Sequence, residues 1–427
     1  MRILYVSQYF PPETAAPAVR VHELSREWVK LGHKVTVLTG FPNHPTGILH
    51  SDYRKKFRRM TTRETVDGID VVRSWLVPLP NRKALERIVN YSSFCFSAAL
   101  RGLFLKKFDV VVATSPQLLV GLSGLAISRL RGSKFIFEVR DLWPESLVGT
   151  GVADTSSLVY RSLLKVSSRL YRSCDHVVAV TPAFKDHIQK HFDCPAEKIS
   201  VVPNGVDLDF FEQARLNYVP SRNGRFVVSF IGTIGNAHGV DVILAAARAL
   251  RESHPAVLFR IVGEGAERER IESEIKKAQF DNIEVLGHQP RARIPSLIWD
   301  SDVCLVLLKR SDVFRTVIPT KMLEFMAAGR PVILGVEGQA LEILALARAG
   351  IGIPPESSEG LVSAVLKLMS EPSLCRLYGE NGKSYIHENM SRKSTAVAYE
   401  NVLLRLVGDG AVEQETINHT VSAGSNS

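Results

Sequence analysis

Several patterns that would identify common classes of nucleotide-binding protein are missing from this 427-residue chain. The first apolar run, RILYVS, continues as QYFPPETAAPAVR, so no GxGxxG motif follows it, and no GxxxxGK[ST] loop occurs anywhere. Those glycine patterns let a backbone approach a dinucleotide or a nucleoside triphosphate closely. The sequence therefore disfavours a dinucleotide-dependent oxidoreductase and a P-loop NTPase.

Cysteine is scarce, and long apolar runs are missing. The five cysteines are far apart in the sequence: Cys95, Cys174, Cys194, Cys304 and Cys375. They form no CxxC or Cys/His ligand spacing, which argues against a disulfide framework or a zinc site and fits a reducing compartment. The start, MRILYVSQYF, predicts a first strand rather than a signal peptide, because its apolar run soon meets polar residues. No uncharged apolar stretch reaches about 18 residues, so we expect no membrane-spanning helix.

Positive charge is in excess but unevenly spread. The chain has 53 Lys+Arg and 44 Asp+Glu, for a net charge of +9 and a pI near 9.3. Residues 1–200 hold 29 basic and 17 acidic residues, and subtraction from the totals leaves 24 and 27 for residues 201–427. An anionic partner is therefore expected at the first half. No nucleic-acid-binding motif accompanies the charge, so we do not expect nucleic acid.

Short β-branched runs alternate with helical patterns, which predicts an α/β fold with parallel sheets covered on both faces. One set of runs ends near Pro203 and a second begins at Phe226, with a Pro-, Asn- and Gly-rich connection between them. We predict two doubly wound, Rossmann-like domains with a cleft between them. The predicted ranges are 1–197 with a C-terminal helix at 392–407, then 198–391, with a disordered tail at 408–427.

The segment PTKMLEFMAAGRPVILG (319–335) carries the strongest chemical signal. Lys321 and Glu324 are spaced to lie on one face of a helix, near its positive end. Lys321 and the helix N-terminus can bind phosphate, while Glu324 can accept hydrogen bonds from ribose hydroxyls. An exposed ion pair between the two is the alternative that these residues alone leave open.

This segment resembles the retaining glycosyltransferases of family 4, which have the GT-B fold. Further segments agree in order and spacing over residues 1–407: PPETAAPAVR, EVRDLWPES, VVPNGVDLDFF, FIGTIGNAHGVD and IVGEGAERE. RDLWPES and PTKMLEFMAAG look especially like the branch with bacterial N-acetylfucosamine and colanic-acid-type transferases. The resemblance implies a nucleotide-sugar co-substrate, with Glu324 on its ribose. The alternatives are a nucleotide-sugar epimerase of the same fold and a non-enzymatic sugar-binding protein.

Two glycine-containing turns are the expected donor-binding loops. Small residues there let backbone N–H groups approach a diphosphate, although an ordinary strand-to-helix turn looks the same in sequence. Many relatives have an Arg and a Lys in the first loop where this chain has Thr233 and His238. The expected donor-binding residues of the two loops are Gly232, Thr233, Gly235, Asn236, His238, Gly263 and Gly265.

The resemblance also suggests where the reaction takes place. Many relatives have a His-Asp pair at the position of Arg140 and Asp141, and the arginine suits an anionic group. Thr316 occupies the first acidic position of the family's E-x7-E pattern, so a covalent intermediate on a carboxylate there is not available. We therefore expect Arg140, Asp141 and Thr316 at the reacting centre, with Arg315 as a further donor contact. The alternatives are an Arg140–Asp141 pair that only supports the turn and an Arg315 that only lies at the surface.

Two residues of the first loop and two later acids complete the candidates. Glu13 and Arg20 are expected to contact acceptor or phosphate, with loop and helix-cap charges as the alternative. Asp207 and Asp209 form a DxD pattern, but it follows a Pro-Asn-Gly turn, where Asp favours turns and helix caps. We interpret the pair as structural, and expect no cofactor and no obligatory metal.

Two basic, aromatic segments suggest contact with an anionic membrane surface: 52–63 and 81–107. The resemblance favours this reading, because related enzymes glycosylate lipid-linked acceptors through this half. The overall expectation is a transferase on the cytoplasmic face of the membrane. It would move a sugar, with retention, from a UDP-linked N-acetylated deoxysugar such as UDP-N-acetylfucosamine to a lipid-diphosphate-linked saccharide.

Overall fold

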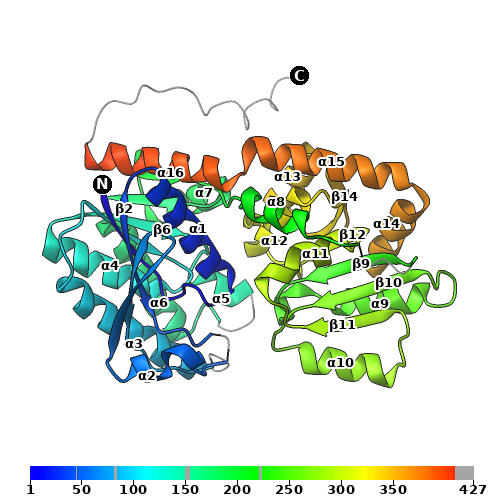
Figure 1. Ribbon diagram of the computed structural model, residues 1–427, viewed down its shortest axis with the longest axis horizontal. Coiled ribbons are helices and arrows are strands. Elements are labelled where there is room, and N and C mark those ends of the chain that lie inside the picture. The colour runs from blue at the N-terminus through cyan, green and yellow to red at the C-terminus, as the bar shows by residue number, and fades with distance from the viewer. Residues whose placement is uncertain (45, 81–83, 150–153, 221–223, 409–427) are drawn as a thin grey trace.

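Two α/β domains lie side by side in the computed structural model, each built around a largely parallel sheet (Figure 1). The structure describes residues 1–44, 46–80, 84–149, 154–220 and 224–408. The predicted tail at 408–427 lies outside these residues except for Gly408, which caps the last helix in a left-handed conformation. This is the predicted fold class.

The first sheet has eight strands among the described residues, and seven of them are parallel. In spatial order they are β3 (Thr61–Val66), β4 (Ile69–Ser74), β2 (Lys34–Gly40), β1 (Arg2–Val6), β5 (Val110–Thr114), β6 (Lys134–Val139), β7 (His176–Ala179) and β8 (Ile199–Val201). The exception, β3, forms a hairpin with β4 through Asp67-Gly68, both with positive φ. Asp-Gly is a common pair at such a turn because both residues tolerate that conformation.

Helices cover both faces of this sheet. Along β1, Ile3 and Tyr5 pack in one core with α1 and the C-terminal helix, whereas Leu4 and Val6 pack in the other. This alternation follows from the two-residue period of a strand. The helices are α1 (Ala16–Lys30), α2 (Arg54–Phe57), α3 (Ala84–Leu103), α4 (Leu118–Arg131), α5 (Glu145–Gly149), α6 (Leu158–Ser173) and α7 (Pro182–Phe192).

The second sheet is parallel throughout its six described strands, and it too has one core on each face. In spatial order they are β11 (Ile283–Gly287), β10 (Val257–Val262), β9 (Phe226–Ile231), β12 (Val303–Leu307), β13 (Val332–Gly335) and β14 (Gly350–Gly352). Its helices are α8 (Leu208–Leu216), α9 (Asp241–Leu250), α10 (Arg268–Lys277), α11 (Ile294–Trp299), α12 (Thr320–Ala327), α13 (Gln339–Leu346), α14 (Ser358–Ser370) and α15 (Pro372–Asn389).

The chain crosses between the domains twice, at adjacent places. Val206 and Ser391 pair as an isolated parallel bridge, and α16 (Arg392–Val407) then returns over the first domain, as Figure 1 shows. There the ring of Tyr399 stacks on that of Trp28 of α1, with 5.1 Å between the ring centroids. The helix has the expected bounds, but the predicted boundary after residue 197 lies too early. β8 pairs with β7, so the first domain extends at least through Val201.

No helix in the described part of the chain is long and apolar enough to cross a membrane.

Candidate active site

The ammonium group of Lys321 is the first polar group of the candidate site. Its Nζ is buried at the start of α12, with no hydrogen bond to the described residues. It lies 4.1 Å from the ring centroid of Phe230 on β9, and a Cβ on Gly232 would come within 3.5 Å of it. Burial lowers the pKa of Lys321 to about 7. Such a group is costly to bury alone, so its position favours binding of an anion.

His238 approaches the same place from the β9–α9 loop. Its Nδ1 is buried without a partner among the described residues, and its ring lies 6.2 Å from that of Phe230. Burial, and then the charge of Lys321, lower the pKa of His238 to about 3. The imidazole is therefore neutral at pH 7 and can donate a hydrogen bond. Lys321 and His238 thus bring two unpartnered polar groups to one site beside Phe230.

The glycines of the two predicted donor loops hold these loops against each other. A Cβ on Gly263 would lie 1.8 Å from the carbonyl oxygen of Gly232, and a Cβ on Gly265 would lie 2.2 Å from that of Ile234. Hydrogen bonds between the loops join Gly232 N–H to Val262 O at 2.9 Å and Ile234 N–H to Glu264 O at 2.8 Å. The spacing of the two glycines thus has a structural reason in loop packing, whatever ligand the loops bind.

Glu324 is paired with an arginine that the sequence did not suggest. Its carboxylate accepts a hydrogen bond from Arg291 Nη1 at 3.0 Å, and Arg291 Nη2 lies 2.6 Å from its other oxygen in the same ion pair. Arg291 also lies over the ring of Phe210, at 4.8 Å from its centroid. The ion pair between Glu324 and Lys321, which the sequence left open as the alternative, is not formed. A carboxylate has four lone-pair sites, so Glu324 keeps capacity to accept a further donor.

The other expected donor contacts are more exposed. Thr233 and Asn236 lie in the β9–α9 loop, and Asn236 Oδ1 accepts a hydrogen bond from Lys309 Nζ at 2.5 Å. Arg315 is 59 % exposed and lies 4.0 Å from Glu337. Their contact with donor remains a prediction.

On the first domain, Arg140 and Asp141 follow β6 at its carboxyl end. Ser115 Oγ accepts a hydrogen bond from the Arg140 backbone N–H at 2.7 Å, which fixes the turn. The Arg140 guanidinium atoms Nε and Nη1 are buried without a partner among the described residues. Burial, and then Arg20, lower the pKa of Arg140, whereas burial raises the pKa of Asp141 to about 6.

Arg20, which was expected to contact substrate, is 2 % exposed and donates its hydrogen bonds within the protein. It donates to Glu138 from Nη2 at 2.8 Å and from Nε at 3.1 Å, and to Asn204 Oδ1 at 2.9 Å. Tyr5 also donates to Glu138, at 2.6 Å. Burial acts to raise the pKa of Glu138, but the neighbouring arginines and hydrogen bonds hold it below its ordinary value. The geometry thus gives Arg20 a structural role.

Glu13 is likewise buried in the loop after β1. Its carboxylate accepts backbone N–H groups from Asn43 at 3.0 Å, His44 at 2.9 Å and Phe10 at 3.3 Å. Burial raises its pKa to about 7 despite these bonds. The side chain therefore ties the β1–α1 loop to the segment after β2, and its contact with acceptor remains a prediction.

Thr316 lies where the two domains meet. It ends a short 3-10 turn, η5 (Val313–Thr316), its hydroxyl donates to Val313 O at 2.7 Å, and its carbonyl accepts from Thr181 Oγ1 of the first domain at 3.0 Å. The next residue, Val317, packs against cores of both domains. A carboxylate nucleophile is missing at this position, as the sequence indicated.

The Asp207-x-Asp209 pair is structural, as expected. Asp207 caps α8 by accepting from Phe210 N and pairs with Arg26 at 2.8 Å, and Asp209 pairs with Lys393 at 3.0 Å. In the described ranges no group of three or more His, Cys, Asp or Glu side chains is placed to hold a metal ion.

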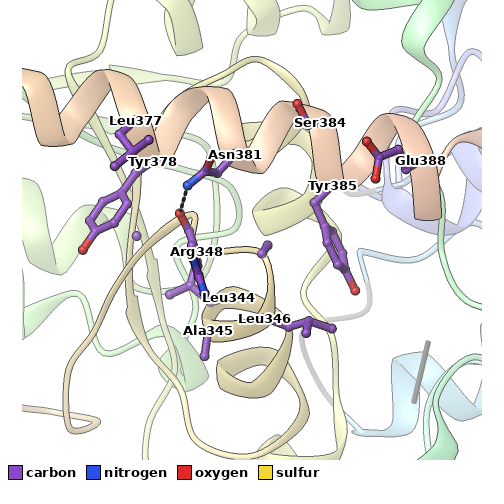
Figure 2. A pocket seen from close by; sticks show the side chains of 12 residues that line it. Leu344, Ala345, Leu346, Arg348, Leu377, Tyr378, Asn381, Ser384, Tyr385 and Glu388 are labelled. Carbon is purple, nitrogen blue, oxygen red and sulfur yellow. Dashed lines mark hydrogen bonds between the residues drawn. The ribbon is translucent and has the colours of Figure 1, made fainter. Parts of the chain in front are cut away.

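A pocket of about 630 Å³ lies away from all these residues, between the end of α13 and α15. Figure 2 shows Asn381 on α15 donating to the carbonyl of Arg348, at 3.1 Å, with Tyr378 and Tyr385 on either side. Its lining includes none of the expected site residues.

The sequence missed Phe230, Arg291 and Lys309. Phe230 belongs to a run that reads as buried strand, and its place under Lys321 follows only from the fold. Arg291 and Lys309 are polar residues that follow strands β11 and β12. Searching every strand's carboxyl end for such residues, rather than only the family motifs, would have identified them.

Two family models together match most of the chain. Residues 17–210 match "Glycosyltransferase Family 4", and residues 216–385 match "Glycosyl transferases group 1". A putative colanic acid biosynthesis glycosyl transferase, WcaI, from Escherichia coli is 22% identical over 96% of this chain and 99% of its own. Probable glycosyltransferase WbjE from Pseudomonas aeruginosa is 26% identical over 64% of this chain and 69% of its own.

Solved structures agree on the fold. A sucrose-phosphate synthase from Thermosynechococcus elongatus superposes with a TM-score of 0.76 at 18% identity, covering 96% of this chain and all of its own. WaaG, a glycosyltransferase involved in lipopolysaccharide biosynthesis, gives 0.67 at 15% identity, covering 94% and 99%. The epimerase alternative gains no support from these matches. The chain belongs to the family 4 glycosyltransferases and has their two-domain GT-B fold.

Proposed function

We propose that this glycosyltransferase uses a UDP-sugar, whose diphosphate binds at Lys321 and His238. The observation that carries the proposal is the pair of buried, unpartnered groups beside Phe230, one of them at the N-terminus of a helix. Both can donate hydrogen bonds to phosphate oxygens, and a bound anion removes the cost of leaving them unpaired. Glu324 would accept from the ribose.

Names of relatives support the donor and the pathway. A structural neighbour, HepE from Anabaena, is described in complex with UDP-glucose. WcaI is named for colanic acid and WaaG for lipopolysaccharide biosynthesis. We infer a role in surface polysaccharide synthesis at the cytoplasmic face of the membrane. The donor would be a UDP-linked N-acetylated deoxysugar such as UDP-N-acetylfucosamine, and the acceptor a lipid-diphosphate-linked saccharide.

The transfer would proceed with retention. The bond between the anomeric carbon and the diphosphate breaks, the acceptor oxygen bonds to the same face of that carbon, and its proton passes to the leaving diphosphate. Thr316 offers no carboxylate for a covalent intermediate. Fixed charges that stabilise the departing diphosphate, here Lys321, would lower the barrier instead. No metal and no further cofactor is needed for this scheme.

The overall proposal is tested with a panel of nucleotide-sugars. Stabilisation of the purified protein by UDP-sugars over GDP-, ADP- and dTDP-sugars is expected in a thermal-shift assay. NMR of the product formed from the best donor should show the donor's anomeric configuration retained. Inversion, or stabilisation by another nucleotide class alone, would refute the corresponding part of the proposal.

A ribose contact at Glu324 predicts a preference for UDP over 2′-deoxy-UDP that depends on this carboxylate. A hydrogen bond to a charged acceptor is worth about 1.5–3 kcal/mol, so roughly tenfold or more of the preference is expected to vanish in Glu324→Gln. The measurement is calorimetric titration of both nucleotides. Their ratio cancels any general loosening from the unpaired Arg291, and exposed Glu252→Gln is the control. An unchanged ratio would refute the contact.

We propose that the membrane contact is made through α3. Phe94 and Ala98 on one side of this helix are buried. Six large apolar side chains are exposed at helical spacing along the opposite side and just beyond the helix: Leu85, Ile88, Val89, Phe96, Leu100 and Phe104. We call this set the α3 stripe. Exposed Lys106 and Lys107 follow it, and cations beside an apolar face suit an anionic bilayer. Arg82 and Lys83 of the predicted segment lie outside the described residues.

The double variant Phe96→Ser/Phe104→Ser is expected to bind vesicles containing phosphatidylglycerol at least tenfold more weakly in a sedimentation assay. Burying each phenyl group in lipid is worth about 1.5–3 kcal/mol, which serine does not replace. Leu216→Ser, at an 86 % exposed position of the second domain, is the control. Equal binding by both variants would rule out the α3 stripe as the contact.

A further inference from the structure

The guanidinium of Arg140, which follows the carboxyl end of β6 in the first domain, is a cation that the proposed donor site does not use. The backbone N–H of Arg140 donates a hydrogen bond to Ser115 Oγ, which fixes the position of the backbone from which the side chain extends. Nε and Nη1 are buried and make no hydrogen bond with the described residues. An arginine left in this state is costly, because its donors have lost water without gaining partners.

The neighbouring Arg20 has the hydrogen-bond partners that Arg140 lacks. Its guanidinium makes two hydrogen bonds to Glu138 and one to Asn204. Glu138 also accepts from Tyr5, so this carboxylate already serves three donors. Asp141, beside Arg140, is the remaining acid that acts on it, and burial raises the pKa of Asp141 to about 6. The internal anions therefore leave Nε and Nη1 of Arg140 without a hydrogen-bond partner among the described residues.

We propose that Arg140 determines specificity by binding an anionic group, a carboxylate or a phosphate, on the portion of the substrate that contacts the first domain. A guanidinium fork matches both groups through two parallel hydrogen bonds. Asp141 next to it can accept from a neighbouring hydroxyl. The inference rests on the proposed function, because it assumes that a sugar donor and its acceptor meet in this cleft.

The anion is separate from the donor diphosphate in this scheme, because Lys321 and His238 of the second domain are placed for that group. Two sources remain. One is a carboxylate on the transferred sugar, as in a uronic acid, which would replace the neutral donor named above. The other is the diphosphate of the lipid-linked acceptor.

The experiment compares Arg140→Gln with the wild type in two calorimetric arms. The first titrates UDP-glucuronate and UDP-glucose, which differ at C6 by a carboxylate against a hydroxymethyl group. The second titrates farnesyl diphosphate and farnesyl monophosphate. Arg140→Lys keeps the charge but not the fork, and Arg161→Gln, at an exposed position of the same domain, is the matched control.

A preference of at least tenfold for the more anionic probe in either arm is expected, reduced to less than threefold in Arg140→Gln and partly restored in Arg140→Lys. The arm in which it occurs identifies the source. No such preference in either arm, or one that Arg140→Gln leaves intact, overturns the inference. Unchanged affinity for UDP shows that the variant is folded and that the donor site is independent. If the proposed donor site were wrong, Lys321→Met would leave the affinity for UDP unchanged, which is a different result from a failure of the Arg140 inference.

Discussion

Lys321→Met is expected to lower the affinity for UDP about a hundredfold, because removing one partner of a buried, hydrogen-bonded charge pair costs about 2–5 kcal/mol. Methionine keeps the length and apolar stem of the side chain, so the contact with Phe230 is largely retained. The loss thus reports on the ammonium group itself. Exposed Lys277→Met, in the same domain, should bind UDP like the wild type.

The same variant separates binding from stability. In the folded, empty protein the pKa of Lys321 is about 7, below that of a lysine in the unfolded chain. The unfolded state therefore binds more protons between pH 7 and about 10.4, and the buried group lowers stability most at the acid end of that window. Removing it should leave the thermal midpoint at pH 7 equal or higher. A large fall in the midpoint would show that the ammonium stabilises the fold instead.

The pH dependence of binding follows from the same group. A diphosphate favours the charged form of Lys321 and so raises its pKa on binding. Above pH 7 UDP binding must then take up a proton, and affinity is expected to fall as the pH rises, by up to about tenfold per unit. Titrations in two buffers of different ionisation enthalpy measure the uptake directly. The proton uptake should disappear in Lys321→Met, and its persistence there would assign the proton to another group.

The parts of the site that could be predicted are those that local sequence pattern controls. Lys321 stands at the start of a short amphipathic segment, and Arg140 directly follows an apolar run, so both were expected at strand or helix ends facing the cleft. The alternating cores of β1 likewise follow from strand periodicity. Each of these features is decided within a few residues of the chain.

The parts that could not be predicted depend on pairs far apart in sequence. Arg291 meets Glu324 across 33 positions and Arg20 meets Glu138 across 118, and no local pattern distinguishes such partners from solvated surface charges. Arg20 was therefore expected at the substrate, whereas the fold buries it. The apolar runs of the first domain were expected to end near Pro203, yet the domain boundary was set after residue 197, and the pairing of β8 with β7 moves it beyond Val201.

Gly263→Ala is expected to be the most disruptive small substitution in the donor loops. A Cβ there would lie 1.8 Å from Gly232 O, and the glycine has φ +142°, which side chains rarely adopt. The clashing atom is backbone, so the β9–α9 loop must move away, at a combined cost of about 2–4 kcal/mol for strain and overpacking. At about 2–4 °C per kcal/mol for a domain of this size, the thermal midpoint should fall by roughly 5–15 °C.

Gly239→Ala is the matched control for this prediction, because it separates backbone strain from the clash. Gly239 lies in the same β9–α9 loop with φ +55°, but nothing lies within 4 Å of a Cβ built there. Its substitution should cost about 1–2 kcal/mol, the strain of the left-handed conformation alone. Gly263→Ala should also weaken UDP binding, since the displaced loop carries Gly232 and His238, whereas Gly239→Ala should leave it within a few-fold. Equal losses of stability and of UDP affinity in both variants would show that the two loops move apart at little cost, and that their contact does not maintain the geometry of the donor site.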